Sequence, residues 1–80
     1  MRVEVRLFAT LVAFLPPEAR PAGSIVVEVP ADSTVADLAT VLGVPGAVAR
    51  VTLVNDSEAG DGHRLAAGDV VTLFPPLAGG

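Results

Sequence analysis

The sequence predicts a small α+β protein in which a mixed sheet of four to five strands packs on one main helix. Segments rich in β-branched and bulky apolar residues, at 2–7, 24–29, 51–54 and 70–74, predict the strands. Residues 31–43 instead carry apolar residues at the spacing of an amphipathic helix. The 80 residues contain no internal repeat or linker, and a chain of this length forms one domain that buries roughly 60–65% of its unfolded surface.

The first two strands alternate along their length, which is typical of strands with one face in water. Pro30 ends the second strand because proline cannot donate a hydrogen bond to a neighbouring strand. Between the two strands, residues 9–15 carry apolar side chains at helical spacing and predict a short extra helix that ends before Pro16 and Pro17. The side chains expected to face the core are Val3, Val5 and Leu7 in the first strand, Leu11, Phe14 and Leu15 in the short helix, and Ile25, Val27 and Val29 in the second strand.

The main helix has signals at both of its ends. Thr34 can cap its N-terminus, and Asp37, three residues later, is placed to complete a capping box. Gly43 is placed to end the helix in the left-handed conformation, and Pro45 prevents its continuation. The stripe expected to face the core consists of Val35, Leu38, Ala39 and Leu42.

The second half of the chain predicts the remaining strands and the order of the sheet. The acidic, glycine-rich residues 55–62 form a loop, and residues 63–65 predict a brief edge strand with Leu65 facing inward. Gly68 supplies a positive φ in the turn before the last strand. The connection between the second and third strands is long enough for a crossover that holds the main helix. We therefore expect a mixed sheet, and we place the last strand between the first and the third.

Charge and composition narrow the class of function. The net charge is −4, and all five basic residues are arginine, so the chain lacks the basic patch of a nucleic-acid-binding protein. It has no cysteine, which leaves no thiolate for a metal site or for sulfur chemistry and fits a reducing cytosol. No stretch reaches the roughly 18 apolar residues needed to cross a membrane. We expect a cytoplasmic protein whose partners are proteins.

The last residues of the sequence are the most informative for function. Pro75 and Pro76 end the last strand and form a stiff spacer, and Leu77-Ala78-Gly79-Gly80 follows with almost no side-chain bulk. Glycine lets a backbone pass through a narrow channel and adopt any φ. We therefore divide the chain into a domain of residues 1–74 and a flexible tail of residues 75–80, and expect the terminal carboxylate of Gly80 to be the functional group. An inert, frayed end is the alternative.

The other polar residues predict structural roles. His63 stands alone beside a glycine-rich loop, whereas a metal site needs three or four donors. The acidic loop at residues 55–62 lacks the spacing of a calcium loop. No side chain is therefore predicted to be catalytic. Two interpretations stay open for Phe74 and Leu77: Phe74 closes the core, or both form an apolar docking patch at the root of the tail.

Four segments of the chain match a known pattern: Val5-Arg-Leu-Phe-Ala9 with Leu11, Asp32-Ser-Thr-Val-Ala-Asp-Leu38, Leu65-Ala-Ala-Gly-Asp-Val70 and, the most specific, Leu73-Phe-Pro-Pro-Leu-Ala-Gly-Gly80. With these segments the chain resembles the MoaD branch of the ubiquitin-like sulfur-carrier proteins, the MoaD/ThiS family, in which MoaD is the small subunit of molybdopterin synthase. The ThiS branch is similar in its helix and its glycine pair but generally lacks the proline pair, so Pro75-Pro76 favours MoaD. The resemblance implies the β-grasp fold of ubiquitin.

The resemblance also implies a mechanism. An E1-like adenylyltransferase of the MoeB/ThiF type binds the carrier and ATP, and the Gly80 carboxylate attacks the α-phosphate to give an acyl-adenylate. A persulfide sulfur then displaces AMP and leaves a thiocarboxylate on Gly80, which donates sulfur to a pterin precursor in the larger, MoaE-type synthase subunit. The carrier itself binds no permanent cofactor, since ATP belongs to the activating enzyme. The tail and partner-binding residues implied are Phe74, Pro75, Pro76, Leu77, Ala78 and Gly79.

Two departures from the family pattern concern the partner. The segment after Phe8 is more apolar than the charged helix usual at this place, and the loop after Val54 is longer and acidic. The alternatives are a ThiS-like carrier for thiamin thiazole synthesis and a ubiquitin-like modifier that forms isopeptide bonds through Gly80. The net charge of −4 also predicts an acidic surround for the tail root and a partner with a basic, apolar-floored groove.

Overall fold

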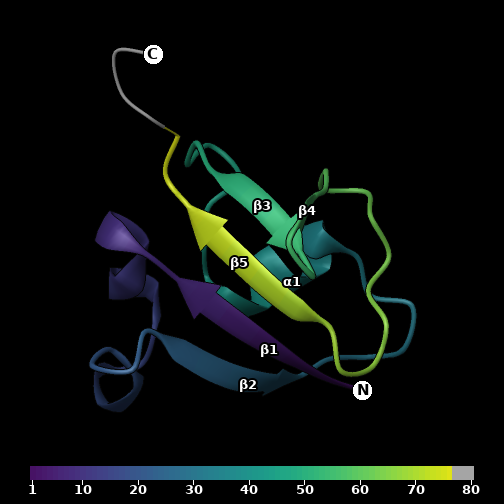
Figure 1. The fold of residues 1–80 in the computed structure, drawn as a ribbon, viewed down its shortest axis with the longest axis horizontal. Coiled ribbons are helices and arrows are strands. Elements are labelled where there is room, and N and C mark those ends of the chain that lie inside the picture. Colours follow the sequence, from purple (N-terminus) through teal and green to yellow (C-terminus); the bar gives the residue numbers. More distant parts are fainter. Residues whose placement is uncertain (77–80) are drawn as a thin grey trace.

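The computed structural model of the protein describes residues 1–76. Over these residues the strands are β1 (Arg2–Leu7), β2 (Ser24–Glu28), β3 (Val51–Val54), β4 (Ser57–Glu58) and β5 (Val70–Phe74), and the helices are α1 (Val35–Leu42) and two 3₁₀ helices, η1 (Ala9–Phe14) and η2 (Pro17–Ala19). The strands form one sheet in the order β2-β1-β5-β3-β4, and α1 lies behind it in Figure 1. The predicted mixed sheet on one main helix is confirmed.

The last strand, β5, lies at the centre of the sheet. It runs parallel to β1, with Val5 opposite Val71, and antiparallel to β3, with Thr52 opposite Leu73. β2 and β3 lie on either side of the β1–β5 pair, and the connection between them carries α1 across one face (Figure 1). The predicted position of the last strand between the first and the third is therefore confirmed.

The core lies between the sheet and the helices α1 and η1. In β1, β3 and β5 the residues that point toward α1 are almost fully buried, and Val5 and Val71 are 0% exposed, whereas Ile25 and Val27 of β2 are half-buried. The remaining members of the buried cluster are Val3, Leu7, Leu11, Leu15, Val29, Val35, Leu38, Val54, Leu65 and Leu73. The opposite face of the sheet, turned toward the viewer in Figure 1, carries no helix among the described residues. We call it the open face.

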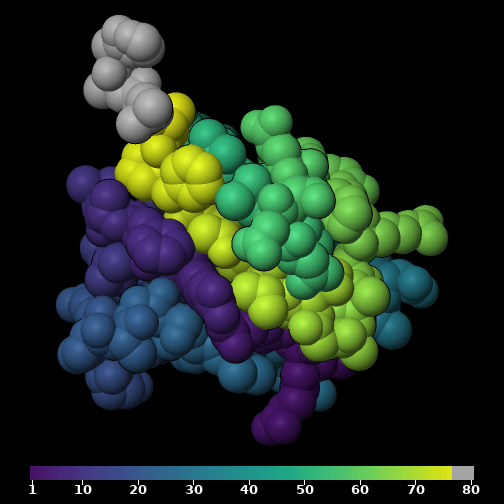
Figure 2. Space-filling model, viewed as in Figure 1, coloured from purple at the N-terminus to yellow at the C-terminus, as the bar shows by residue number. Residues whose placement is uncertain are grey.

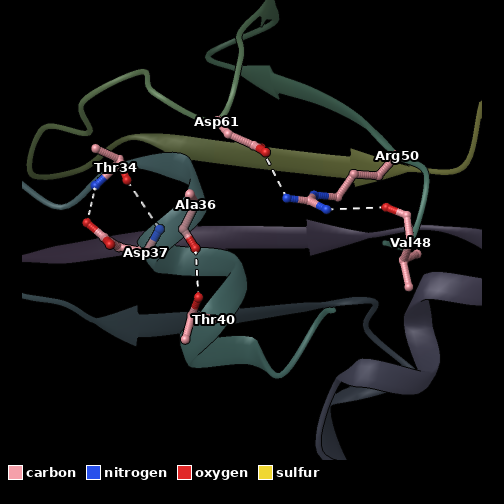
Figure 3. A network of polar contacts seen from close by, with 7 residues as sticks. All are labelled: Thr34, Ala36, Asp37, Thr40, Val48, Arg50 and Asp61. Carbon is pink, nitrogen blue, oxygen red and sulfur yellow. Dashed lines mark hydrogen bonds and ion pairs between the residues drawn. The ribbon is translucent and has the colours of Figure 1, made fainter. Parts of the chain in front are cut away.

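Both ends of α1 follow from the sequence signals. Thr34 Oγ1 accepts a hydrogen bond from the Asp37 N–H (3.2 Å), and Asp37 Oδ2 accepts one from the Thr34 N–H (2.9 Å), as Figure 3 shows. Gly43 ends the helix at φ 79°, in the left-handed region that glycine adopts without strain. The helix begins at Val35, so residues 31–33 of the predicted segment lie outside it.

Thr34→Ala is expected to lower the free energy of unfolding by about 1 kcal/mol, because the helix loses the acceptor of its capping box. Thr40→Ala is the matched control: Thr40 lies on the exposed face of the same helix and its hydroxyl donates only to the Ala36 carbonyl (Figure 3). Alanine at that position favours the helix by a few tenths of a kcal/mol, by roughly the difference in helix propensity. Chemical denaturation of both variants checks the cap, and equal losses in the two would contradict it.

The short helix after β1 differs in type from the prediction. Residues Ala9–Phe14 form a 3₁₀ helix, held by bonds such as Leu11 N–H to the Phe8 carbonyl (3.1 Å). Its inward side chains are those predicted: Leu11 is buried and Phe14 is half-buried. These two residues are three apart, the spacing that coincides on a 3₁₀ helix with three residues per turn.

The predicted edge strand at residues 63–65 is wrong. The edge strand is β4, which pairs with β3 through Leu53 opposite Glu58, whereas Arg64 forms only an isolated bridge with Thr34. Asn55 and Asp56 connect β3 to β4 with φ of 50° and 70°, the two positive values that a tight two-residue hairpin requires. Asparagine and aspartate tolerate such values better than most residues. This dipeptide between two short strands was the sequence signal for the hairpin.

Arg50 links the loop before β3 to the loop after β4. Its side chain is 7% exposed, and it donates to Asp61 Oδ1 (3.1 Å) and to the Val48 carbonyl (3.2 Å), as drawn in Figure 3. The Asp61 carbonyl in turn accepts from the Ala36 N–H of α1 (3.0 Å). The acidic loop is thus tied to the helix, and Asp61 serves as a structural residue.

Candidate functional site

The candidate site lies where β5 leaves the sheet. β5 ends at Phe74, at the tip of the yellow arrow in Figure 1. Pro75, which is half-buried, and Pro76, which is exposed, follow the strand. The division into a domain of residues 1–74 and a tail of residues 75–80 stays a prediction. Leu77, Ala78, Gly79 and Gly80 lie outside the described residues, so their part in the site remains a prediction from the sequence.

Phe74 belongs to the open face and not to the core. Alternation along β5 buries Leu73 (1% exposed) and turns Phe74 to the other side of the sheet, where it is half-buried opposite Val51. Phe74 is absent from the buried cluster. Phe74 therefore does not close the core, and its part in a docking patch stays a prediction.

Phe8 joins Phe74 on the open face. Its N–H donates to the Leu73 carbonyl (3.1 Å), which continues the parallel ladder of β1 and β5 by one residue, and its side chain is 52% exposed. Figure 2 shows this face, with the yellow end of β5 between purple β1 and teal β3. The resulting surface, which we call the open-face patch, consists of Phe8, Val51, Leu53 and Phe74.

The charges on the open face are of both signs. Arg6, 51% exposed, lies opposite Thr72 of β5, and its Nε is 2.6 Å from Glu4 Oε2. Glu58 lies opposite Leu53 on the far side of the patch. The net charge had predicted an acidic surface around the tail root. These residues do not form one, because cationic and anionic groups both border the open-face patch. The net charge was a poor guide because it is summed over the whole surface, and the position of each charge depends on the sheet register.

The other candidates from the sequence have structural positions. His63 is exposed, and its backbone carbonyl accepts the Val35 N–H at the start of α1 (3.0 Å). Within residues 1–76 no group of three or more potential metal-ligating side chains comes together. No helix in this part of the chain is both long enough and apolar enough to span a bilayer.

Comparisons with known proteins agree with the fold. A model of the Mut7-C ubiquitin family matches residues 1–78. SAMP1 of Haloferax volcanii is 31% identical over 100% of both chains, with a TM-score of 0.73. The HVO 2177 protein of the same organism is 32% identical over 100% of this chain and 87% of its own, with a TM-score of 0.76. None of the curated proteins compared with the chain matches it.

A more distant structure shares the fold. The complex of subunits 1 and 2 of molybdopterin-converting factor from Helicobacter pylori contains a chain that is 22% identical over 100% of both chains, with a TM-score of 0.65. The predicted β-grasp fold is thereby confirmed. Because the family match covers residues 1–78 and a full-length relative is 31% identical, the chain belongs to the Mut7-C ubiquitin family of ubiquitin-like proteins.

Proposed function

We propose that the protein is a sulfur carrier whose Gly80 carboxylate is adenylated and then converted to a thiocarboxylate. The observation that carries this proposal is the position of β5, which runs through the centre of the sheet and ends in the open-face patch, directly before the proline pair. Six residues, 75–80, follow the patch, and an extended chain of that length spans at most about 20 Å. A partner bound to the patch thus receives the carboxylate within that distance.

The chemistry of the proposed steps requires no side chain of the carrier. A Gly80 carboxylate oxygen attacks the α-phosphorus of ATP, and the bond to pyrophosphate breaks. The terminal sulfur of an enzyme persulfide then attacks the acyl carbon, and AMP leaves. A second thiol cleaves the sulfur–sulfur bond of the acyl disulfide, which releases the thiocarboxylate and forms a disulfide in the enzyme. The absence of cysteine from the chain is compatible with this sequence, because both sulfur reagents belong to partners.

The proposed partners are an E1-like adenylyltransferase and a larger synthase subunit. The structure from Helicobacter pylori is a complex of two subunits of molybdopterin-converting factor, which supports a larger partner subunit of that kind. We propose molybdopterin synthesis as the destination of the sulfur, with a pterin precursor as acceptor in the larger subunit. ATP is a substrate of the activating enzyme and not a resident cofactor of the carrier.

A second candidate function is protein modification. It is favoured by sequence identity: the chain is 31% identical over its full length to SAMP1, a small archaeal modifier protein, but 22% identical to the molybdopterin-converting factor subunit. In that case the Gly80 acyl group would pass to a lysine amine of a target protein and form an isopeptide bond. The chain has no lysine of its own, so it could not be linked into chains through its own lysines.

The two candidates separate in a reconstituted reaction. The chain is incubated with its organism's E1-like enzyme, ATP and a persulfide-bearing sulfurtransferase, and its intact mass is followed. We expect an ATP-dependent gain equal to the exchange of one oxygen for sulfur. If an acyl-adenylate forms but the only stable products are conjugates on lysines of added proteins, the modifier function replaces the carrier function.

Phe8→Ala is expected to weaken binding of the activating enzyme by tenfold or more, because aromatic side chains are enriched at protein interfaces and a few residues carry most of the binding energy there. Stability should change by less than about 1 kcal/mol, since the side chain is 52% exposed. Val26→Ala is the matched control: Val26 is 58% exposed on the same face but lies on β2, with β1 between it and β5. Isothermal titration of the activating enzyme with each variant measures the two affinities. Equal affinities would contradict binding through the open-face patch.

A further inference from the structure

Among residues 1–76, no strand pairs with the outer side of β2. β2 pairs with β1 on one side only, and it is the first strand in the sheet order over residues 1–76. The other edge strand, β4, is two residues long and carries Glu58. Short or charged edges are the usual protection against pairing with another chain. β2 carries one charge, Glu28 at its C-terminal end, but neither a lysine nor a proline, and its central residue, Val26, is 58% exposed.

The ladder between β1 and β2 shows which backbone groups of β2 point outward. Met1 and Val29 exchange both of their hydrogen bonds, and the Leu7 N–H donates to the Gly23 carbonyl. Bonded pairs alternate with non-bonded pairs in an antiparallel ladder, and the register therefore leaves the N–H and C=O groups of Ser24, Val26 and Glu28 directed away from β1. Within the part of the chain that the structure describes, these groups have no backbone hydrogen-bond partner, and we call them the outer hydrogen-bonding row of β2.

An apolar groove of about 540 Å³ runs along this row, between β2 and α1. Its α1 side is formed by Val41, 56% exposed, and by the half-buried Leu42. The remaining lining residues are Phe14, Leu15, Pro16, Ile25, Val26, Val27 and Glu28. A free strand edge beside an apolar groove has the two features with which an extended peptide is bound by strand addition: backbone bonds for affinity and pockets for alternate side chains.

The charge at one end of the groove indicates the chemistry of the occupant. Glu28 lines that end, and a neighbouring hollow of about 430 Å³, which shares Val41 with the groove, is lined by Asp32 and Asp37. No arginine lines either hollow. Glu28 lies 3.7 Å from Arg2 and 3.8 Å from the N-terminal ammonium of Met1. The Glu28 side chain is 73% exposed and that of Arg2 81%, and ion pairs of exposed carboxylates are weak enough to rearrange. A basic segment fits this end.

We propose that β2 and α1 bind an extended segment of a partner protein in which basic residues precede alternating β-branched apolar residues. The segment adds to the sheet antiparallel to β2, so that its basic end lies beside Glu28, Asp32 and Asp37. β1 separates β2 from β5, and the groove lies on the outer side of β2. The tail root and the open-face patch therefore remain free for another partner while the segment is bound.

The test uses the full chain, labelled with ¹⁵N, and the probe peptide acetyl-Arg-Arg-Val-Ile-Val-Thr-amide. We expect saturable amide shift changes in residues 24–28 and 35–42. A peptide with aspartate in place of both arginines, and one with proline in place of isoleucine, should each bind about tenfold more weakly or not at all. Absence of saturable changes, or changes confined to the open-face patch, would overturn the proposal.

Two variants of β2 locate the contact. Val26→Pro removes an N–H that points away from β1, so the sheet is expected to keep its fold, as the amide spectrum will report. It should bind the probe at least about tenfold more weakly. Val26→Thr keeps both the N–H and a β-branched side chain, and should bind within about threefold of the original chain. If both bind alike, strand addition is excluded. A concentration-dependent dimer that Val26→Pro abolishes would overturn the proposal by assigning the groove to a second copy.

Discussion

A chain extended by one alanine after Gly80 is expected to lose ATP-dependent activation completely while unfolding at the same temperature as the original chain. The extension moves the carboxylate by about 3.5 Å and adds a Cβ at the reacting residue. Attack on the α-phosphorus requires reacting atoms roughly 3–3.5 Å apart in a fixed orientation, so a displacement of that size removes the reactive geometry. Pyrophosphate exchange and thermal unfolding, measured on the same preparation, check both parts.

Two further variants test the length of the tail and the bulk of its last residue one at a time. Glycine added after Gly80 shifts the carboxylate without adding a side chain, whereas Gly80→Ala keeps the length and adds only the Cβ. Both are expected to be inactive if the channel of the activating enzyme admits only glycine at its end. An extended chain that still gains sulfur, and whose mass shows that it has not been trimmed, would remove the Gly80 carboxylate from the mechanism.

Leu73→Ala is expected to cost about 2–5 kcal/mol of the free energy of unfolding, because it opens a cavity in the centre of the sheet. Leu73 is 1% exposed and lies opposite both Leu7 and Thr52. Small domains have only about 5–15 kcal/mol in total, so the variant should be partly unfolded at moderate denaturant. Denaturant titration with a two-state fit measures the loss.

The control for this substitution is Leu53→Ala. Leu53 is half-buried on the open face, next to β5 on β3, and the same change there should cost roughly half as much or less. Activation should fall in Leu73→Ala only in proportion to the unfolded fraction, because the core residue has no direct contact with a partner. A fully folded Leu73→Ala chain that is inactive would show that this residue acts in recognition.

The elements that could be predicted from the sequence are those with local signals. Thr34, Asp37 and Gly43 mark the ends of α1 through contacts within a few residues of themselves, and the structure has each of these contacts. At the ends of α1, side chain and backbone interact over short sequence distances, so the local pattern carries most of the information. For β5, β-branched and bulky residues indicated a central strand, but its pairing partners are distant in the sequence.

The features that escaped prediction depend on register or on distant contacts. The charges around the open-face patch follow from which residues of β1, β3 and β5 lie opposite one another, and composition does not contain that register. Arg50 is buried against Asp61, eleven residues away, and nothing near it in the sequence distinguishes it from the exposed arginines. The free edge of β2 likewise appears only once the whole strand order is known.

The most direct test of the central claim is the intact mass of the protein isolated from its own cells under conditions that preserve thioesters and thiocarboxylates. The proposed function predicts a population that is heavier by the exchange of one oxygen for sulfur, with the change located on Gly80 by fragmentation. A protein whose Gly80 carboxylate is always unmodified, continues into further residues, or occurs only in isopeptide linkage to lysines of other proteins would contradict the sulfur-carrier function.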